Sequence, residues 1–120
     1  MLQLTPHHRL LLAVNPVDFR RGIDGLAAAC QLVLNEQPLS GTVFVFANRS
    51  RTAVKILVYD GHGYWLCHRR FSKGKLKWWP SSVKKTAAIN AADLQVLLYQ
   101  GLPHVSQMSA PFKSVRTKDD

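Results

Sequence analysis

The sequence predicts an α+β fold: an antiparallel β-meander of about four to five strands, an amphipathic helix packed on one face, and a short C-terminal helix. Strand-like runs follow one another directly between residues 41 and 79, and helical periodicity occurs before and after them. Of the 120 residues, 47% are hydrophobic, which is enough for one core without disulfides or metal. We therefore expect a single globular domain over residues 1–102.

The N-terminal third supplies one strand and the longer helix. Residues 10–14 form a short apolar run that ends at an Asn-Pro pair, as expected for a strand. Apolar residues then recur at helical spacing from Ile23 to Leu34, which predicts a helix over residues 24–35. The stretch 16–22 before it is expected to form a turn or a single helical turn.

The middle of the chain alternates in the manner of strands. GTVFVFA at 41–47 is apolar on both faces, which is typical of a central strand. TAVKILVYD, the DGHG turn at 60–63 and the returning GYWLCHRRF predict a hairpin. KLKWW at 75–79 could add a further short strand, with Lys75, Lys77 and Trp79 on one face and Leu76 and Trp78 on the other.

The C-terminal third supplies the second helix. Residues 80–88 are expected to form a linker. Asn90 is a favourable N-cap with Asp93 three residues later, which predicts a helix that ends at Gly101. Residues 103–120 are rich in Ser, Pro, Lys and Asp, and we expect a mostly disordered tail.

Positive charge is concentrated in one part of the chain. Residues 1–46 and 86–120 each sum to zero, whereas residues 47–85 hold ten Lys or Arg against Asp60 alone, so this segment accounts for the whole net charge of +9. Charge segregated in this way favours a polyanionic partner. The alternatives are a solvated face, an edge strand protected by lysines, and an acidic protein partner.

No catalytic or metal-binding motif accompanies this charge. Phosphoryl chemistry would need converging carboxylates, and Asp18, Asp24 and Asp60 are each explained better by a turn or a helix start. The chain has no P-loop, nucleophile elbow or H-E-x-x-H motif, and no C-x-x-C pair accompanies the nearby histidines. We therefore expect neither an enzyme nor a bound metal or cofactor.

The basic segment offers side chains that suit phosphates and bases. Arginines and lysines in loops and at strand ends can follow a phosphate backbone, and an exposed tryptophan can stack on an unpaired base. We expect at least one of Trp78 and Trp79 to lie in the core. The candidate nucleic-acid contacts are Arg49, Arg51, Lys55, Arg69, Arg70, Lys73, Lys75, Lys77 and Trp79.

Three segments, in fixed order, carry a family resemblance. They are NPVDFRRGIDGLAAAC, SGTVFVFANRSRTAVKILVYDGHGYWL and RRFSKGKLKWWP, covering about residues 13 to 80. They resemble the TnpB protein, the second open reading frame of insertion sequences of the sixty-six family, and not the unrelated RNA-guided nucleases of the same name. The resemblance implies a bacterial accessory protein of transposition, encoded beside a separate transposase that is expected to hold the DNA-cutting carboxylates.

Some polar residues of the family pattern have no evident role in folding from the sequence alone. They are Asp18, Arg20, Asn48, Arg49, Lys55 and Arg70, and they are candidates for a binding surface. Trp65 and Leu26, by contrast, are expected in the core.

The chain contains no apolar run long enough to span a membrane and no evident secretory signal, so we expect a cytoplasmic protein. Its two cysteines are then expected to be buried and reduced. The expected partners are DNA and the transposase of the same element. Two alternatives stay open: docking on the transposase with little DNA binding, and formation of a homo-oligomer.

Overall fold

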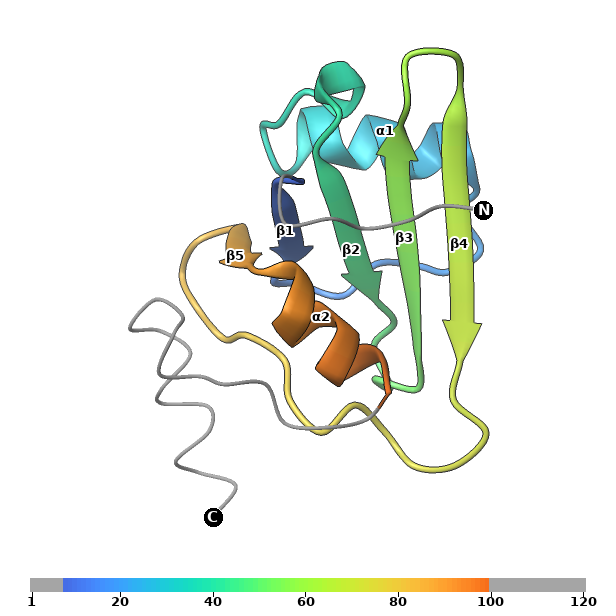
Figure 1. Ribbon diagram of the computed structural model, residues 1–120, viewed down its shortest axis with the longest axis vertical. Helices are drawn as coiled ribbons and strands as arrows, with labels where there is room; N and C mark the ends of the chain where they lie inside the picture. The colour runs from blue at the N-terminus through green and yellow to red at the C-terminus, as the bar shows by residue number, and fades with distance from the viewer. Residues whose placement is uncertain (1–7, 100–120) are drawn as a thin grey trace.

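A computed structural model describes residues 8–99 of the chain (Figure 1). These residues form a five-stranded sheet of order β4-β3-β2-β1-β5 with two α-helices. The α+β class is therefore confirmed. The predicted tail at 103–120 and the predicted helix end at Gly101 lie outside the described residues.

The first strand and the longer helix form a crossover unit. β1 (Leu10–Ala13) is followed by α1 (Ile23–Leu32), the short 3₁₀ helix η1 (Pro38–Ser40) and β2 (Val43–Ala47). β1 and β2 are adjacent and parallel, with Leu10 opposite Val43. Because parallel neighbours need a long connection, α1 supplies the crossover and covers one face of the sheet.

The remaining strands are antiparallel. β3 (Ala53–Tyr59) pairs with β2, and β4 (Tyr64–Arg70) pairs with β3 along its whole length. β5 (Thr86–Ile89) pairs with β1 at the other edge. The sheet is thus mostly antiparallel, as predicted, with one parallel pair that the predicted meander lacked.

Two strand predictions were wrong. Residues 86–88 were expected in a linker, but they belong to β5, which gives the backbone of β1 its second partner. Residues 75–79 do not form a strand, and Trp78 and Trp79 are both buried in the same core cluster, on one face of the sheet. Consecutive residues of a strand point to opposite faces, and this segment instead turns both indoles under the sheet.

Helix α1 begins close to the predicted start and ends at Leu32, three residues before the predicted end. Asn35 adopts a left-handed conformation (φ 56°), and the amide of Glu36 donates to the carbonyl of Cys30 at 2.8 Å. The amide of Leu34 likewise donates to the carbonyl of Ala29 at 3.1 Å, so two carbonyls of the last turn gain partners from residues beyond the helix. The helix therefore stops where its last carbonyls find these partners.

The two helices cover opposite faces of the sheet (Figure 1). On the α1 face, Leu26 and Cys30 pack against apolar residues of β1, β2 and β3. On the other face, Trp78, Trp79 and α2 (Ala91–Leu98) pack against the alternate residues of these strands. The prediction that Leu26 is core is confirmed. Trp65 was wrongly placed in the core: it lies on the edge strand β4 and is 40% exposed.

Helix α2 begins as the sequence predicts. The Oδ1 of Asn90 accepts a hydrogen bond from the amide of Asp93 at 2.7 Å, so Asn90 is the N-cap. Ile89 and Leu94 are both buried in the same cluster. No helix within residues 8–99 is long and apolar enough to cross a membrane.

Candidate nucleic-acid interface

Most of the candidate cations gather where three segments meet at one end of the sheet. The β2–β3 loop (48–52), the end of β4 and the start of the β4–β5 connection (71–85) lie together there. The amide of Phe71 donates to the carbonyl of Thr52 at 3.0 Å, and that of Leu76 donates to the carbonyl of Arg51 at 2.8 Å. These backbone hydrogen bonds hold the β2–β3 loop beside the start of the β4–β5 connection, although the two are far apart in the sequence.

The β2–β3 loop is held from inside by Asn48. Its Oδ1 accepts from the amides of Thr52 (2.9 Å) and Ala53 (3.2 Å), and its Nδ2 donates to Thr52 Oγ1 at 2.9 Å. Asn48 therefore has a role in folding that the sequence did not show. The loop it closes leaves Arg49 exposed to solvent.

Arg51 joins the loop to the connection below it. Its backbone is left-handed (φ 61°), and its guanidinium carbon lies 5.6 Å from the centroid of the Trp79 ring. Burial lowers the pKa of Arg51 from its ordinary value, but a guanidinium stays charged in proteins. Arg51 thus contributes positive potential from a half-buried position.

Trp79 does not offer a free ring face for a base. It is 4% exposed, and its Nε1 donates to the carbonyl of Ala13 at 3.1 Å. Trp78 is also buried, so both tryptophans serve the core. Trp79 therefore leaves the set of candidate DNA contacts, because a stacking residue must present its face to solvent.

Lys55 is also unsuited to contact DNA. It is 8% exposed, and its Nζ donates to the carbonyls of Phe19 (2.8 Å) and Arg21 (3.0 Å). The same ammonium lies 5.1 Å from the Phe19 ring centroid. Lys55 thus ties the segment between β1 and α1 to the sheet, which explains a buried lysine in the middle of a strand.

The other candidates are exposed around this end. Arg69 and Arg70 are the last two residues of β4, and their side chains point to opposite faces of the sheet because they are consecutive in a strand. Arg69 pairs with Val54 and Arg70 with Ala53. The Arg69 guanidinium carbon lies 4.9 Å from the ring centroid of Tyr99, at the end of α2. Lys73, Lys75 and Lys77 extend along the exposed part of the connection. Six of the nine candidates are therefore exposed here: Arg49, Arg69, Arg70, Lys73, Lys75 and Lys77.

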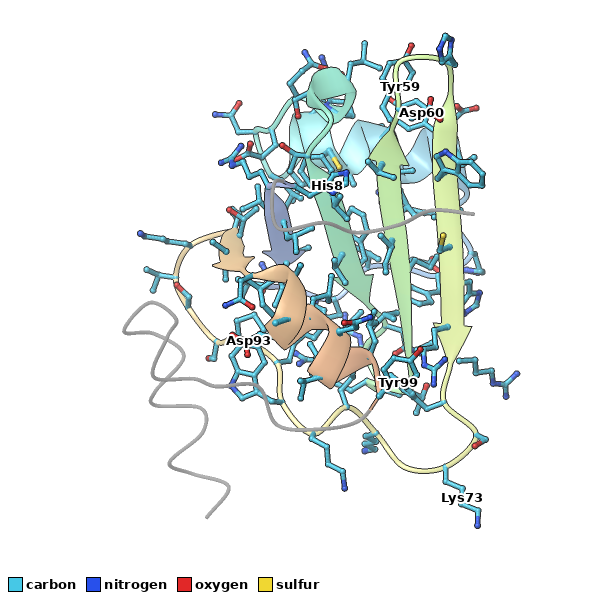
Figure 2. All side chains as sticks on the ribbon, viewed as in Figure 1. His8, Tyr59, Asp60, Lys73, Asp93 and Tyr99 are labelled. Carbon is cyan, nitrogen blue, oxygen red and sulfur yellow. The ribbon has the colours of Figure 1, made fainter. Side chains whose placement is uncertain are left out.

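The single carboxylate of this part of the chain lies far from these cations. Asp60 is the only acidic residue between positions 37 and 92. Figure 2 shows Asp60 in the β3–β4 turn, at the opposite end of the sheet from Lys73. Its Oδ2 accepts from Trp65 Nε1 at 2.8 Å and its Oδ1 accepts from the amides of His62 and Gly63, which together lower the pKa of Asp60. The basic end is therefore not neutralised by this residue.

A groove brings the other candidate surface residues, Asp18, Arg20 and Asn48, beside Arg49 of the basic end. It runs between the β1–α1 segment and the β2–β3 loop, and its lining includes Asp18, Arg20, Asn48 and Arg49. The amide of Val17 donates to the carbonyl of Ala47 at 3.1 Å, which fixes the two segments side by side. Residues thirty positions apart are thus brought together, and nothing in the local sequence pattern signals this contact.

Asp18 and Arg20 neutralise each other in that groove. The Nη2 of Arg20 lies 2.7 Å from Asp18 Oδ2, and its amide also donates to Asp18 Oδ1. The side-chain and backbone hydrogen bonds from Arg20 lower the pKa of Asp18 to about 2. Arg49, exposed beside this pair, is the groove's uncompensated cation among the residues that line it.

Two of the carboxylates singled out from the sequence, Asp18 and Asp60, are engaged in other contacts. Within residues 8–99, no group of three His, Cys, Asp or Glu side chains is placed to hold a metal ion. Asp18 is paired with Arg20, and Asp60 lies in the turn at the other end of the sheet. The described residues thus offer a basic surface and, beside it, the groove in which Asp18 pairs with Arg20.

Fold and site together define a small α+β protein with a concentrated basic surface at one end of a mixed sheet. The chain belongs to the IS66 Orf2-like protein family, whose model matches residues 8–108. The family is one of insertion-sequence accessory proteins rather than of known enzymes, as the sequence resemblance implied.

Two relatives come from Sinorhizobium fredii (strain NBRC 101917 / NGR234). Uncharacterized protein y4hO is 37% identical over 98 residues, covering 82% of this chain and 84% of the relative. Uncharacterized protein y4jC is 32% identical over 105 residues, covering 88% of each chain. No solved structure matches the chain significantly.

Proposed function

We propose that the protein binds DNA without cutting it, as an accessory factor that acts in the cytoplasm with the separate transposase of its element. The observation that carries this proposal is the cluster of exposed cations at one end of the sheet, with Asp60 held at the other end. Phosphates are the natural partners of such a surface, because each neutralised phosphate releases condensed counterions.

The geometry favours contacts to the phosphate backbone over base stacking. Trp78 and Trp79 are buried, and Trp65, the third tryptophan of residues 47–85, lies near the β3–β4 turn, where its Nε1 donates to Asp60. At the basic end the surface therefore presents guanidinium and ammonium groups and no tryptophan ring. Phosphate contacts position a protein on DNA but do not read its sequence. Any preference for the ends of the element then comes from DNA shape or from the transposase.

A binding titration at several salt concentrations tests the proposal, using element ends and scrambled DNA, each with and without the transposase. If the six exposed cations each neutralise one phosphate, log K should fall against log salt with a slope of about −5. Binding that is absent at low salt, for single-stranded and duplex DNA alike, would contradict the proposal.

A second candidate function is docking on the transposase with little DNA binding. The observation that favours it is an apolar surface around the end of α1: Leu32 is 81% exposed, Val33 52% and Leu39, on η1, 54%. Figure 1 shows η1 at the end of the sheet away from the β4–β5 connection. This apolar surface and the basic end are therefore separable by mutation.

The two functions predict different losses. For docking, Leu32→Ser with Leu39→Ser should abolish capture of the transposase at high salt and leave DNA affinity unchanged. For DNA binding, Arg49→Gln with Arg70→Gln should weaken DNA affinity and leave that capture unchanged. If the Leu32→Ser, Leu39→Ser variant still captures the transposase at high salt, this apolar surface is not the docking site.

A further inference from the structure

The strand β4 leaves one side of the sheet open. It is the edge of the sheet order, and it pairs with β3 over all seven of its residues. Among the described residues, no strand lies on its outer side. An exposed edge of this length presents unpaired amides and carbonyls, which can bind another strand.

The hydrogen-bond pattern shows which residues face that open side. The amide of Asp60 donates to the carbonyl of Gly63, and the amide of Phe71 donates to the carbonyl of Thr52, each at 3.0 Å. Hydrogen-bonded pairs alternate along an antiparallel ladder, so the odd-numbered residues of β4 direct their backbone groups to β3. The outward groups are those of the even-numbered residues: Tyr64, Leu66, His68 and Arg70.

The side chains of β4 are complementary to the same strand reversed. Aromatic residues, Tyr64 and Trp65, stand at its start, and Arg69 and Arg70 stand at its end. Asp60 lies beyond the aromatic end and Lys73 beyond the basic end. A second copy that runs antiparallel would therefore place each basic end beside the acidic and aromatic end of its partner.

We propose that two copies of this chain associate through their β4 edges, forming one continuous sheet with a two-fold axis at Cys67. The alternation of hydrogen-bonded pairs requires one residue to lie opposite the same residue of the partner, with the axis midway between them, and Cys67 is the midpoint of Tyr64–Arg70. Trp65 then lies opposite the partner's Arg69, and Tyr64 lies opposite the partner's Arg70. These cross-strand pairs are of the cation–π type.

This register makes a chemical test available. Cys67 and the partner's Cys67 form a non-hydrogen-bonded pair, whose Cα atoms are about 4.5 Å apart, within the range of a disulfide. Cys30, the other cysteine, is fully buried on the α1 face, and burial raises the pKa of its thiol to about 12. Mild oxidation of the full chain should therefore cross-link copies through Cys67 alone.

The experiment compares matched single-cysteine chains under dilute conditions. Cys30→Ala should cross-link into a dimer, and Cys67→Ala should not. The control for random collision carries Cys30→Ala, Cys67→Ala and Val83→Cys, because Val83 is fully exposed on a distant loop. The cross-linked fraction through Cys67 should exceed that of this control several-fold, and the mass of the reduced chain should rise from 13.5 kDa to about twice that with concentration.

A backbone variant tests the edge itself. The amide of His68 points away from β3, so His68→Pro removes a donor from the open edge and none from the β3–β4 ladder. We expect this variant to keep its far-ultraviolet circular dichroism and to remain a monomer. If it does not fold, the cysteine comparison decides alone. A chain that stays monomeric and cross-links no faster than the Val83→Cys control overturns the proposal and leaves the edge to a different partner.

Discussion

At one end of the sheet the β3–β4 turn is held by Asp60, and at the other end the β2–β3 loop is held by Asn48. Both side chains accept hydrogen bonds from two nearby backbone amides. The turn at Asp60 carries one carboxylate, whereas the loop at Asn48 presents Arg49 and Arg51 beside the lysines of the β4–β5 connection. The side chain that closes each turn is thus distinct from the cations that give the basic end its charge.

The comparison also separates cations that fold the protein from cations that face solvent. Lys55 is buried and bonded to two carbonyls, while Lys75 and Lys77 are exposed. All three lie in the same basic part of the sequence. Net charge alone therefore overstates the number of residues available to a polyanion.

The largest effect is expected for Trp79→Ala. Truncating this buried indole, with its hydrogen bond to Ala13, should destabilise the fold by about 3–5 kcal/mol in urea or guanidinium unfolding. Trp65→Ala, at a 40% exposed position, is the matched control and should cost clearly less. A Trp79→Ala chain of unchanged stability that has lost DNA binding would show that Trp79 contacts DNA after all.

Lys55→Met should come next. The change keeps the apolar stem but leaves the carbonyls of Phe19 and Arg21 without their donor, at a cost of about 1–3 kcal/mol. Because Lys55 contributes to the fold, the slope of log K against log salt for DNA should stay unchanged. If the variant kept wild-type stability and the magnitude of its salt slope fell by about 0.9, the value for one phosphate contact, this structural role for Lys55 would be refuted.

Asn48→Ala should have a smaller effect, about 1–2 kcal/mol, because it removes the hydrogen bonds that close a partly exposed loop. Asn48→Asp is the matched control, since it keeps the acceptor for the amides of Thr52 and Ala53. Thermal unfolding of the two variants should rank Asp above Ala. Equal losses would mean that the Nδ2 bond to Thr52 matters most.

The smallest effect concerns acid. The folded-state pKa of Asp18 is about 2, below its ordinary value of 3.8, so the stabilisation from its pair with Arg20 is present above pH 3.8. It is lost as the pH falls toward 2. Asp18→Asn should therefore show a shallower loss of unfolding midpoint across this window than the wild type. Parallel pH profiles would contradict the assignment.

Local patterns in the sequence predicted much of the fold but not the contacts that distinguish its residues. Alternation identified the β3–β4 hairpin, and capping chemistry identified the start of α2, because both depend on neighbours in the chain. The parallel β1–β2 pair, the pairing of β5 with β1 and the burial of Lys55 depend on segments 30 residues or more apart. Of the candidate site, the sequence identified the cations of residues 47–85 in loops and at a strand end, but it did not indicate that they meet at one end of the sheet. The roles of Asn48 and Trp79 were not foreseen.

The most direct test of the DNA-binding surface compares two variants with the same net charge. Lys75→Gln with Lys77→Gln removes two cations from the basic end, and Arg9→Gln with Arg21→Gln removes two exposed cations from elsewhere. In salt titrations with duplex DNA, the lysine variant should reduce the slope of log K against log salt by about 2, and the arginine variant should leave the slope near that of the wild type. Equal reductions in the two variants would contradict an interface localised at this end of the sheet.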